Sequence, residues 1–423
     1  MMCAALRGTG TKDFGAVEER VRMQGLDLAR QLLQGVVDGL RASEQVVAPE
    51  RCEAGHRYDA LEQRTKTVTT LVGAITVRRW YYYDRHCGKG KTPLDAAWDI
   101  EHTSFSPELR RMMAQVGALL PFRGAAEQLA SLSGITVDAK DIERIASRVA
   151  RSVEATPRYP LPVPDGGVLY MSMDGTGVPM VKQELVGRAG KGSDGRATTR
   201  EAKLGCFFTQ TTRDTAGRPV RDDNSTTYVG AIESAETFGQ RLWCEAKRRG
   251  VETAQQIVAL CDAAAWQWNL IEEYVPSAVQ IIDVYHAREH YWEVARAVWP
   301  DTPRRQQQWA EMRQRELDAG RATQVACAIR RLRPRASHIR ALCAREAEFF
   351  TKNRHRMAYH KFRRKGYFIG SGVLEAGCKT VIGQRLKQAG MHWTVAGANA
   401  IITLRSALVG HDWPVVANYA KAA

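Results

Sequence analysis

The spacing of apolar residues in the first third of the chain predicts helices on either side of a hairpin. From residue 14 to 43, apolar positions recur every three or four residues, which is typical of a helix. Residues 66–83 are β-branched and aromatic, and they predict a hairpin that turns at Gly73. Pro121 and Gly134 separate three further predicted helices. These helices are expected at 107–120, 123–133 and 138–154.

Strands and helices alternate after a proline-rich linker at 158–167. Short apolar or β-branched segments predict strands at 168–173, 204–212, 226–232, 257–261 and 278–282. Helices are predicted at 236–250, 264–274 and 286–298, within a basic helical segment at 301–366, and from about Val373 to Gln388. This order predicts an α/β fold with a mixed sheet and an all-helical insertion, preceded by a small hairpin and a helical N-terminal region.

Composition is that of a globular protein with an excess of positive charge. The chain has 423 residues, of which 44% are hydrophobic and 25% charged, which excludes wholesale disorder. No apolar run approaches the roughly 18 residues that span a bilayer, and the first 17 residues carry no continuous apolar segment. The sequence therefore predicts no membrane association. The nine cysteines are odd in number and scattered, so we also expect reduced thiols and a cytoplasmic location.

The positive charge is concentrated in one segment. The net charge is +15, and residues 301–366 hold 18 Lys and Arg against 6 Asp and Glu, a local excess of 12. A charged run is usually a solvated helical face, but this density exceeds what such a face needs. We therefore expect contact with a polyanion, nucleic acid first and an anionic membrane surface second.

Acidic residues follow the predicted strands. Asp174, Asp262 and Asp283 each end a short buried-type strand, and Glu375 opens a late helix. Ligands of α/β sheets collect at strand ends, and clustered carboxylates with open positions bind Mg²⁺ for phosphoryl transfer. Each Asp also stands where a helix N-cap occurs, so capping alone is the alternative. Spacing leaves open whether Asp262 or Asp283 is the second ligand.

Several segments resemble ISKra-type bacterial insertion-sequence transposases, which belong with the Mutator-like group. The specific combinations are DGTGVP at 174–179 with TREAKLG at 199–205, and GSG, E, RLK, GM and W between 370 and 393. The matching segments, from about residue 65 to 413, are VRRWYYYDRHCGKGKTPLDAAWDI, YMSMDGTGVPM, RATTREAKLG, CDAAAWQW, IIDVYHAREHYW, IGSGVLEAGCKTVIGQRLKQAGMHW and ALVGHDW.

The resemblance implies a ribonuclease-H-like fold whose metal ligands and catalytic triad are Asp174, Asp262 and Glu375. It implies two Mg²⁺ or Mn²⁺ ions at this triad, and it leaves Asp283 and His286 in a supporting role. His286 is near a predicted helix start, where a purely structural histidine is the alternative. The family usually has Gly after the second Asp, whereas this chain has Ala263, a change that affects a turn rather than a ligand.

The resemblance also implies double-stranded DNA as the partner, both as terminal inverted repeats and as target. Candidate DNA contacts are the basic or aromatic residues Arg330, Arg331, Arg333, Arg335, Arg363, Arg364, Lys365, Arg385, Lys387 and Trp393. Arg385 is equally compatible with an ordinary surface position. Trp266 and Trp268 fit core packing or base stacking. Joining two DNA ends requires at least a homodimer, and DNA binding places the protein at the nucleoid.

The expected organisation has five segments. They are a helix and hairpin at 1–100, a helical DNA-binding region at 101–157, the catalytic domain at 158–300, its basic insertion at 301–366 and its last part at 367–423. The helices in 107–154 resemble a helix-turn-helix with Ala130 and Gly134 near the turn, but the turn looks long. An ordinary helical bundle is the alternative.

Structural zinc is a further implication of the resemblance, because the N-terminal part of such proteins often forms a zinc ribbon around a hairpin. This chain keeps the hairpin but has Asp84 where a Cys is expected. The four N or S ligands on offer are Cys52, His56, His86 and Cys87, of which the last two are adjacent. Adjacent ligands suit a ribbon poorly, so the sequence favours a hairpin without zinc.

The sequence predicts a DNA transposase that cleaves element ends and transfers the strands at an Asp-Asp-Glu site. The alternative is a non-catalytic DNA-binding protein, domesticated or decayed, of transposase origin. A two-carboxylate glycoside hydrolase is a third possibility, but it gives the basic insertion no use.

Overall fold

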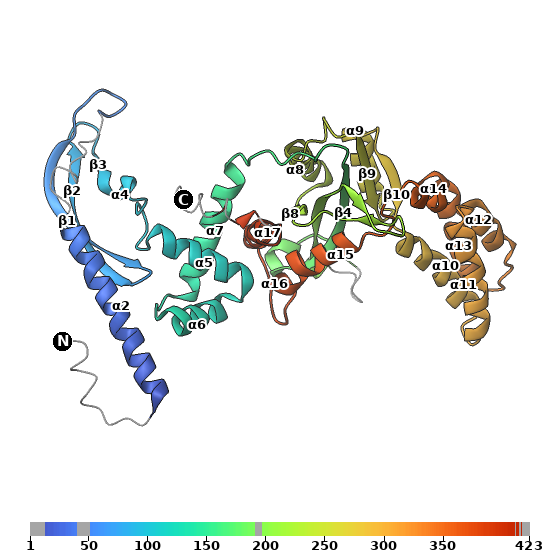
Figure 1. The fold of residues 1–423 in the computed structure, drawn as a ribbon, viewed down its shortest axis with the longest axis horizontal. Coiled ribbons are helices and arrows are strands. Elements are labelled where there is room, and N and C mark those ends of the chain that lie inside the picture. Colours follow the sequence, from blue (N-terminus) through green and yellow to red (C-terminus); the bar gives the residue numbers. More distant parts are fainter. Residues whose placement is uncertain (1–12, 40–50, 191–196, 411, 414–415, 417–423) are drawn as a thin grey trace. The chain divides into compact units, whose positions relative to one another are not determined.

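The computed structural model describes residues 13–39, 51–190, 197–410, 412–413 and 416 (Figure 1). These residues form two compact units, of which the second is Pro157–Trp413 and the first contains the described residues before it. The boundary falls beside the predicted linker at 158–167. Each unit has its own sheet and its own buried residues.

The first unit is built on the predicted hairpin. Strands β1, Asp59–Thr70, and β2, Gly73–Asp84, pair antiparallel, with Thr70 opposite Gly73 across the turn. Gly73 has a φ of 115°, a conformation that glycine adopts without steric strain. The short strand β3, Lys89–Lys91, joins the edge of β2. The hairpin prediction is confirmed and extends further at the β1 start than expected.

Helix α2, Phe14–Gly39, lies along this sheet (Figure 1). The last predicted residues of this helix, 40–43, lie outside the described residues. A small apolar core forms where α2 meets the turn end of the hairpin. Its buried members are Val37, Val68, Ile75, Val77, Leu94 and Ile100.

Four further helices complete the first unit. They are α4, Pro93–Ala97, α5, Pro107–Leu119, α6, Phe122–Ser133, and α7, Ala139–Ala155. Ser106 caps α5 and Asp138 caps α7 through side-chain oxygens, while Gly134 ends α6 in the left-handed conformation at φ 74°. The five residues between α6 and α7 exceed the 3–4 that a helix-turn-helix usually has.

The second unit contains a five-stranded mixed sheet, with strand order β10-β9-β4-β5-β8. Its strands are β4, Val168–Pro179, β5, Thr199–Gln210, β8, Thr227–Ala231, β9, Gln256–Cys261, and β10, Val279–Ile282. Strands β4, β5 and β8 pair antiparallel, and β9 and β10 continue from β4 in parallel. A two-stranded ribbon, β6, Thr212–Arg213, with β7, Pro219–Val220, extends from the end of β5.

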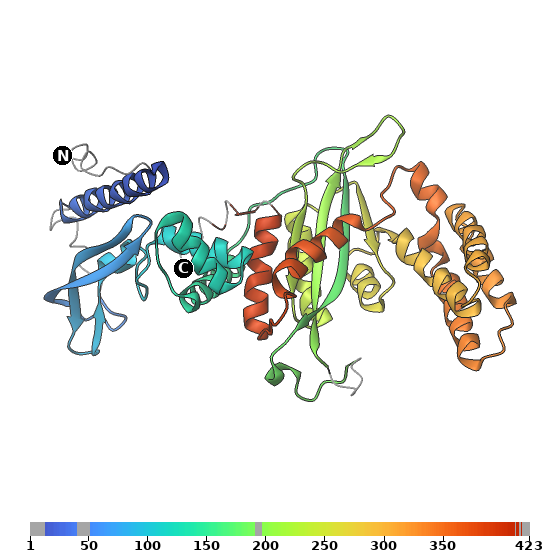
Figure 2. The same cartoon turned by 90° about the horizontal axis from the view of Figure 1, so that it is seen from below.

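Helices cover both faces of this sheet (Figure 2). On one face, α8, Ala235–Arg248, packs Leu242 against Gly205, and α9, Ala265–Tyr274, packs on α8. On the other face, α17, Val395–Val409, packs Ile402 against Gly230. The mixed α/β fold is therefore as predicted.

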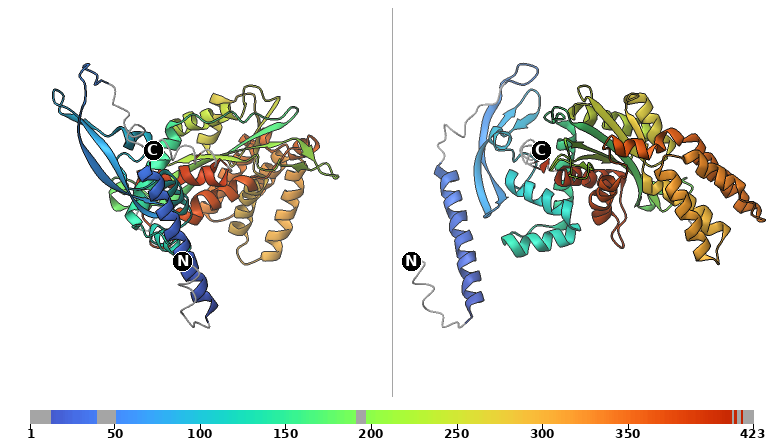
Figure 3. Two further views of the ribbon diagram at one scale, coloured as in Figure 1. Left: turned by 60° about the vertical axis from the view of Figure 1, so that its left-hand side comes forward. Right: turned by 45° about the vertical axis from the view of Figure 1, so that its right-hand side comes forward.

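The insertion at 301–366 is all-helical, as expected. It consists of α11, Pro303–Asp318, α12, Ala322–Arg331, α13, Ser337–Lys352, a 3₁₀ turn at Arg354–Met357, and α14, Tyr359–Arg364. With α10, Val284–Val298, these helices form a bundle beyond the β10 edge of the sheet (Figure 3). Across the described ranges, no helix is both long and apolar enough to cross a membrane.

The predicted helix at 373–388 is broken into three pieces. Helix α15, Gly372–Gly377, passes into a π-helical turn at Cys378–Gly383 and then into α16, Gln384–Leu386. A π-helical turn holds more residues than an α-helical one, so it shifts the faces of the residues that follow it.

Candidate active site

Asp174, in β4, lies level with Asp262, the residue that follows the neighbouring strand β9. The parallel register of β4 and β9 pairs Val168 with Gln256 and Met171 with Ala259. The same offset, continued three residues, brings Asp174 opposite Asp262. The Ser172 hydroxyl, which donates to the Leu260 carbonyl between these two strands, holds them together at this point. The two carboxylates are therefore close enough for the charge of Asp262 to act on Asp174, although Asp174 lies within β4 and not at its end, where the sequence placed it.

Burial and a like charge act on Asp174. Burial raises the pKa of its carboxyl above the ordinary value, and the charges of Asp262 and Glu201 raise it further, although a hydrogen bond from the Gly175 amide opposes them. That N–H donates to Oδ1 of Asp174 at 2.6 Å. A partly buried carboxyl whose ionisation is disfavoured by burial and by a nearby carboxylate is characteristic of functional sites, including those that hold a cation.

The helix that carries Glu375 contacts Asp174 through another residue. Cys378, three residues further on, donates from Sγ to Oδ2 of Asp174 at 3.6 Å. Side chains three residues apart share a helix face, so Glu375 lies one turn from the Asp174 contact. The Glu375 side chain is exposed, and sequence reasoning had not singled out Cys378. The sequence feature that could have indicated Cys378 is its spacing of three residues from Glu375 on a predicted helix.

Asp283 anchors the turn that leads to Glu375. Its Oδ1 accepts a hydrogen bond from the His286 amide at 2.7 Å, which caps α10, and its Oδ2 accepts one from the Ser371 amide. Because the side chain is 2% exposed and both oxygens serve backbone N–H groups, Asp283 acts as a structural anchor here. The supporting position that the sequence expected fits this arrangement.

His286 belongs to a polar chain between α10 and α13. Its Nε2 lies 3.3 Å from Nε2 of His290, whose Nδ1 lies 2.5 Å from the carboxylate of Glu346. Burial by itself raises the pKa of Glu346, but hydrogen bonds from His290 and Arg345 outweigh it and lower the pKa. The structure thus gives His286 hydrogen-bonding partners within the insertion bundle.

The three predicted ligands do not form a close group in this structure. Within the part of the chain that the structure describes, only one group of three or more possible metal ligands converges closely. That group consists of Cys52, His56, Asp84 and Cys87 in the first unit. Asp174, Asp262 and Glu375 do not converge in this way.

The candidate DNA contacts divide by exposure. The exposed ones are Arg330, Arg331, Arg333, Arg335, Arg363, Arg364, Lys365 and Lys387. Lys387 lies beside the candidate site, since its Nζ donates to Oγ1 of Thr176 at 2.5 Å, two residues after Asp174. Lys387 therefore brings a positive charge to the strand of Asp174 from the same segment as Glu375.

Two of the candidate contacts are interior. Arg385 is 1% exposed, with its guanidinium 5.1 Å from the ring centroid of Trp393. Trp393 is 8% exposed, and its Nε1 donates to the Leu386 carbonyl at 3.0 Å. These side chains pack the end of α16 and do not present a surface to DNA.

The two tryptophans after Asp262 support packing. Trp268 is 4% exposed, and the guanidinium of Arg356 lies 4.2 Å from its ring centroid. Trp266 meets Phe238 edge-on at 5.8 Å between ring centroids. Between them, the buried Gln267 donates to the Met173 carbonyl at 3.0 Å and so fixes α9 against the end of β4.

The fold and this site define a mixed α/β protein with paired carboxylates at the end of a central sheet. The chain belongs to the uncharacterised protein family UPF0236, whose model matches residues 11–418. No curated protein matches the sequence significantly. Among solved structures, the chain is similar to the Drosophila P element transposase strand transfer complex at a TM-score of 0.26 and 10% identity, over 76% of this chain and 83% of that one. A TM-score this low does not define a shared fold.

Proposed function

We propose that this protein is a DNA transposase of the ISKra type, with a ribonuclease-H-like catalytic domain in its second unit. The observation that carries the proposal is the level placement of Asp174 and Asp262 on adjacent parallel strands, with the helix of Glu375 held against Asp174 by Cys378. The resemblance of the surrounding motifs to such transposases supports the same three residues. A sheet of three antiparallel strands continued by two parallel ones supports the fold assignment.

The residues present fit divalent magnesium or manganese. All three side chains offer carboxylate oxygens, which are the ligands that Mg²⁺ prefers. The raised pKa of Asp174 reflects a burial and repulsion that a bound cation relieves. Asp174, Asp262 and Glu375 would hold two such ions, which when bound activate the attacking oxygen and neutralise charge on the phosphate.

The chain's own groups would position the DNA. The Nζ of Lys387 lies next to β4, where it can donate to a phosphate of the reacting DNA strand and neutralise its charge. Gln267 holds the backbone at Met173, next to Asp174. Asp283 holds the backbone at Ser371, which leads to Glu375. The exposed arginines of the insertion, at the end of α12 and after it, would hold flanking phosphates.

A cleavage and strand-transfer assay tests the proposal. The substrate is a labelled duplex that carries the genomic sequence flanking the reading frame, incubated with Mg²⁺ and the full chain. We expect nicking at the element end and joining to target DNA. Asp174→Asn, Asp262→Asn and Glu375→Gln should each lower the rate by about 10³-fold or more. Glu252→Gln, an exposed carboxamide substitution in the same unit, is the control and should retain activity.

The outcomes separate the proposal from its alternative. Salt-dependent binding of the end duplex without Mg²⁺-dependent cleavage supports a non-catalytic DNA-binding protein of transposase origin. Unchanged cleavage by the three carboxylate variants removes the proposed site. The proposal also concerns oligomeric state, because a complex that pairs two DNA ends is expected to contain at least two copies of the chain.

A further inference from the structure

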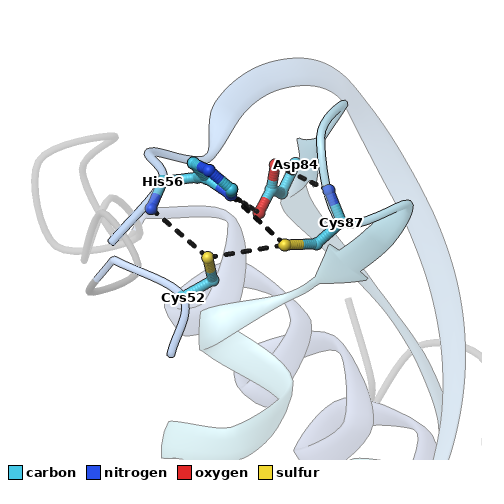
Figure 4. A group of neighbouring side chains, drawn as sticks. All are labelled: Cys52, His56, Asp84 and Cys87. Atoms are coloured by element: carbon cyan, nitrogen blue, oxygen red, sulfur yellow. Dashed lines mark hydrogen bonds and ion pairs between the residues drawn. The ribbon is translucent and has the colours of Figure 1, made fainter. Parts of the chain in front are cut away.

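Four side chains that can bind metal converge at the open end of the hairpin in the first unit (Figure 4). Cys52 and His56 come from the loop that precedes β1, whereas Asp84 ends β2 and Cys87 lies in the turn towards β3. One donor atom from each side chain lies within 4.8 Å of the other three. The convergence joins two segments whose paired residues are 28 to 35 positions apart in the sequence.

The separations match the edges of a tetrahedral zinc site. Zn–S bonds of about 2.3 Å and Zn–N bonds of about 2.0 Å place neighbouring ligand atoms roughly 3.3–3.8 Å apart. The two Sγ atoms of Cys52 and Cys87 are 3.6 Å apart, and Nδ1 of His56 is 3.3 Å from Sγ of Cys87. The same Nδ1 is 3.8 Å from Oδ2 of Asp84. A disulfide would need about 2.05 Å between the sulfurs.

Backbone contacts aim the donor atoms inward. The amide of His56 donates to Sγ of Cys52 at 3.3 Å. Oδ1 of Asp84 accepts the amides of His86 at 2.9 Å and Cys87 at 3.2 Å, which fixes the carboxylate. Hydrogen bonds of this kind orient metal ligands in proteins.

The other carboxylate oxygen is the clearest sign of a missing partner. The Asp84 side chain is 0% exposed, and among the described residues its Oδ2 has no backbone N–H donor, only the thiols of Cys52 and Cys87 and the His56 ring at 3.8 Å beside it. Thiols are weak donors, and a buried carboxylate oxygen with weak partners alone is unfavourable. Here that oxygen faces two cysteine sulfurs and an imidazole nitrogen, so a cation shared with them satisfies it.

The four side chains lie where a bound metal ion would stabilise the hairpin. The apolar core of the hairpin, with Val68 and Ile75, lies at its turn end. At the opposite end, the first seven residues of β1 are all exposed. Only the three-residue strand β3 adds to the hairpin at this end, and small modules of this kind are usually held by a metal or a disulfide.

We propose that Cys52, His56, Asp84 and Cys87 bind one zinc ion, which joins the loop before β1 to the turn after β2. Sulfur and nitrogen donors select zinc over Mg²⁺, and four protein ligands leave no open position, as in structural rather than catalytic sites. The ligand set differs from the one that the sequence offered. Asp84 takes the place of His86, whose ring lies tilted beside that of His56 at 4.8 Å between centroids.

Metal analysis of the full-length protein tests this site. After purification without chelator, elemental mass spectrometry should give about one zinc per chain. Cys52→Ser and Cys87→Ser should lose most of this zinc, and Asp84→Ala should bind it at least 10-fold more weakly. Asp84→Cys should retain it, because a thiolate replaces the carboxylate as ligand. His86→Ala and the exposed Cys244→Ser are matched controls that should keep the metal.

A second measurement covers variants that fail to fold. Cobalt(II) added to wild-type protein should give the visible and charge-transfer absorption of a tetrahedral, cysteine-ligated ion, and zinc should displace it. An Asp174→Asn, Asp262→Asn double variant should show the same spectrum, so the result is independent of the proposed active site. Wild-type protein without zinc or a cobalt spectrum, or with a Cys52–Cys87 disulfide instead, overturns the proposal. Zinc that persists in the Cys52→Ser, Cys87→Ser double variant also overturns it.

Discussion

The carboxylate of Asp283 joins the end of β10 to the amide of Ser371, four residues before Glu375. The same carboxylate caps α10 through the His286 amide. One buried side chain therefore fixes the start of the insertion bundle and the turn into α15 at the same time. The adjacent Val284 amide donates to the Ile369 carbonyl at 2.9 Å and strengthens this junction.

Asp283→Asn should weaken both contacts, with separate effects on stability and on the Mg²⁺ dependence of cleavage. The carboxamide has one acceptor oxygen, so it can serve only one of the two N–H groups. We expect a loss of about 1–3 kcal/mol in the free energy of unfolding. In the cleavage assay, the Mg²⁺ concentration for half-maximal rate should rise, because the turn before Glu375 is no longer held. A variant that loses stability but keeps the wild-type Mg²⁺ dependence contradicts this positioning role.

Asp174→Asn should stabilise the metal-free protein. The folded state raises the pKa of Asp174 through burial and through Asp262, so its ionisation opposes folding. The free energy of unfolding therefore falls as pH rises through that raised pKa, and the amide removes the loss. Thermal unfolding in chelator at neutral pH should show a gain of roughly 1 kcal/mol, the usual scale for relief at a functional site. At acid pH, where the wild-type carboxyl is protonated, the two proteins should converge.

Magnesium supplies the control for this prediction. The ion should raise the melting temperature of the wild type more than that of Asp174→Asn, because the variant lacks a ligand. Equal shifts in the two proteins would show that Mg²⁺ binds elsewhere. A variant that is less stable than wild type at neutral pH, with or without the ion, would show that hydrogen bonding to the carboxylate outweighs the repulsion.

Apolar spacing was sufficient to predict most elements, because helices and strands bury one face at a fixed period. It underestimated β4, which was expected to end at residue 173 and runs to Pro179. The residues beyond Asp174 include Gly175 and Gly177, which have low strand propensity. They are strand residues because β5 pairs with them, opposite Lys203 and Glu201. Such a cross-strand contribution is absent from a local pattern.

The site could be predicted in part for a similar reason. Strand ends pointed to Asp174 and Asp262, but Asp174 lies within β4, and the sheet order that brings the two strands together is a property of tertiary pairing. Arg385 was expected near DNA and is buried. A regular helix from 373 to 388 was assumed, whereas the π-helical turn at Cys378–Gly383 shifts the face on which later residues lie.

Glu346→Gln should destabilise the insertion bundle in a pH-dependent way. The lowered pKa of Glu346 means that its ionised form favours folding, and this contribution is lost as pH falls through that pKa. Urea unfolding at pH 7 should show a loss of about 2 kcal/mol, since hydrogen bonds from His290 and Arg345 are charge-assisted. The loss should shrink towards acid pH. Glu348→Gln, on the exposed face of the same helix, should change stability little at either pH.

Replacing the arginines at the end of α12 should weaken DNA binding most at low salt. Arg330, Arg331, Arg333 and Arg335 are all exposed, so their charges can neutralise phosphates and release counterions. Fluorescence anisotropy with the end duplex should show that the slope of log K against log salt falls by about 0.9 for each contact that alanine removes. Arg218→Ala is the control, because Asp214 at 2.7 Å already offsets its charge. An unchanged slope in the fourfold variant would place the DNA on another surface, even if cleavage depends on Asp174.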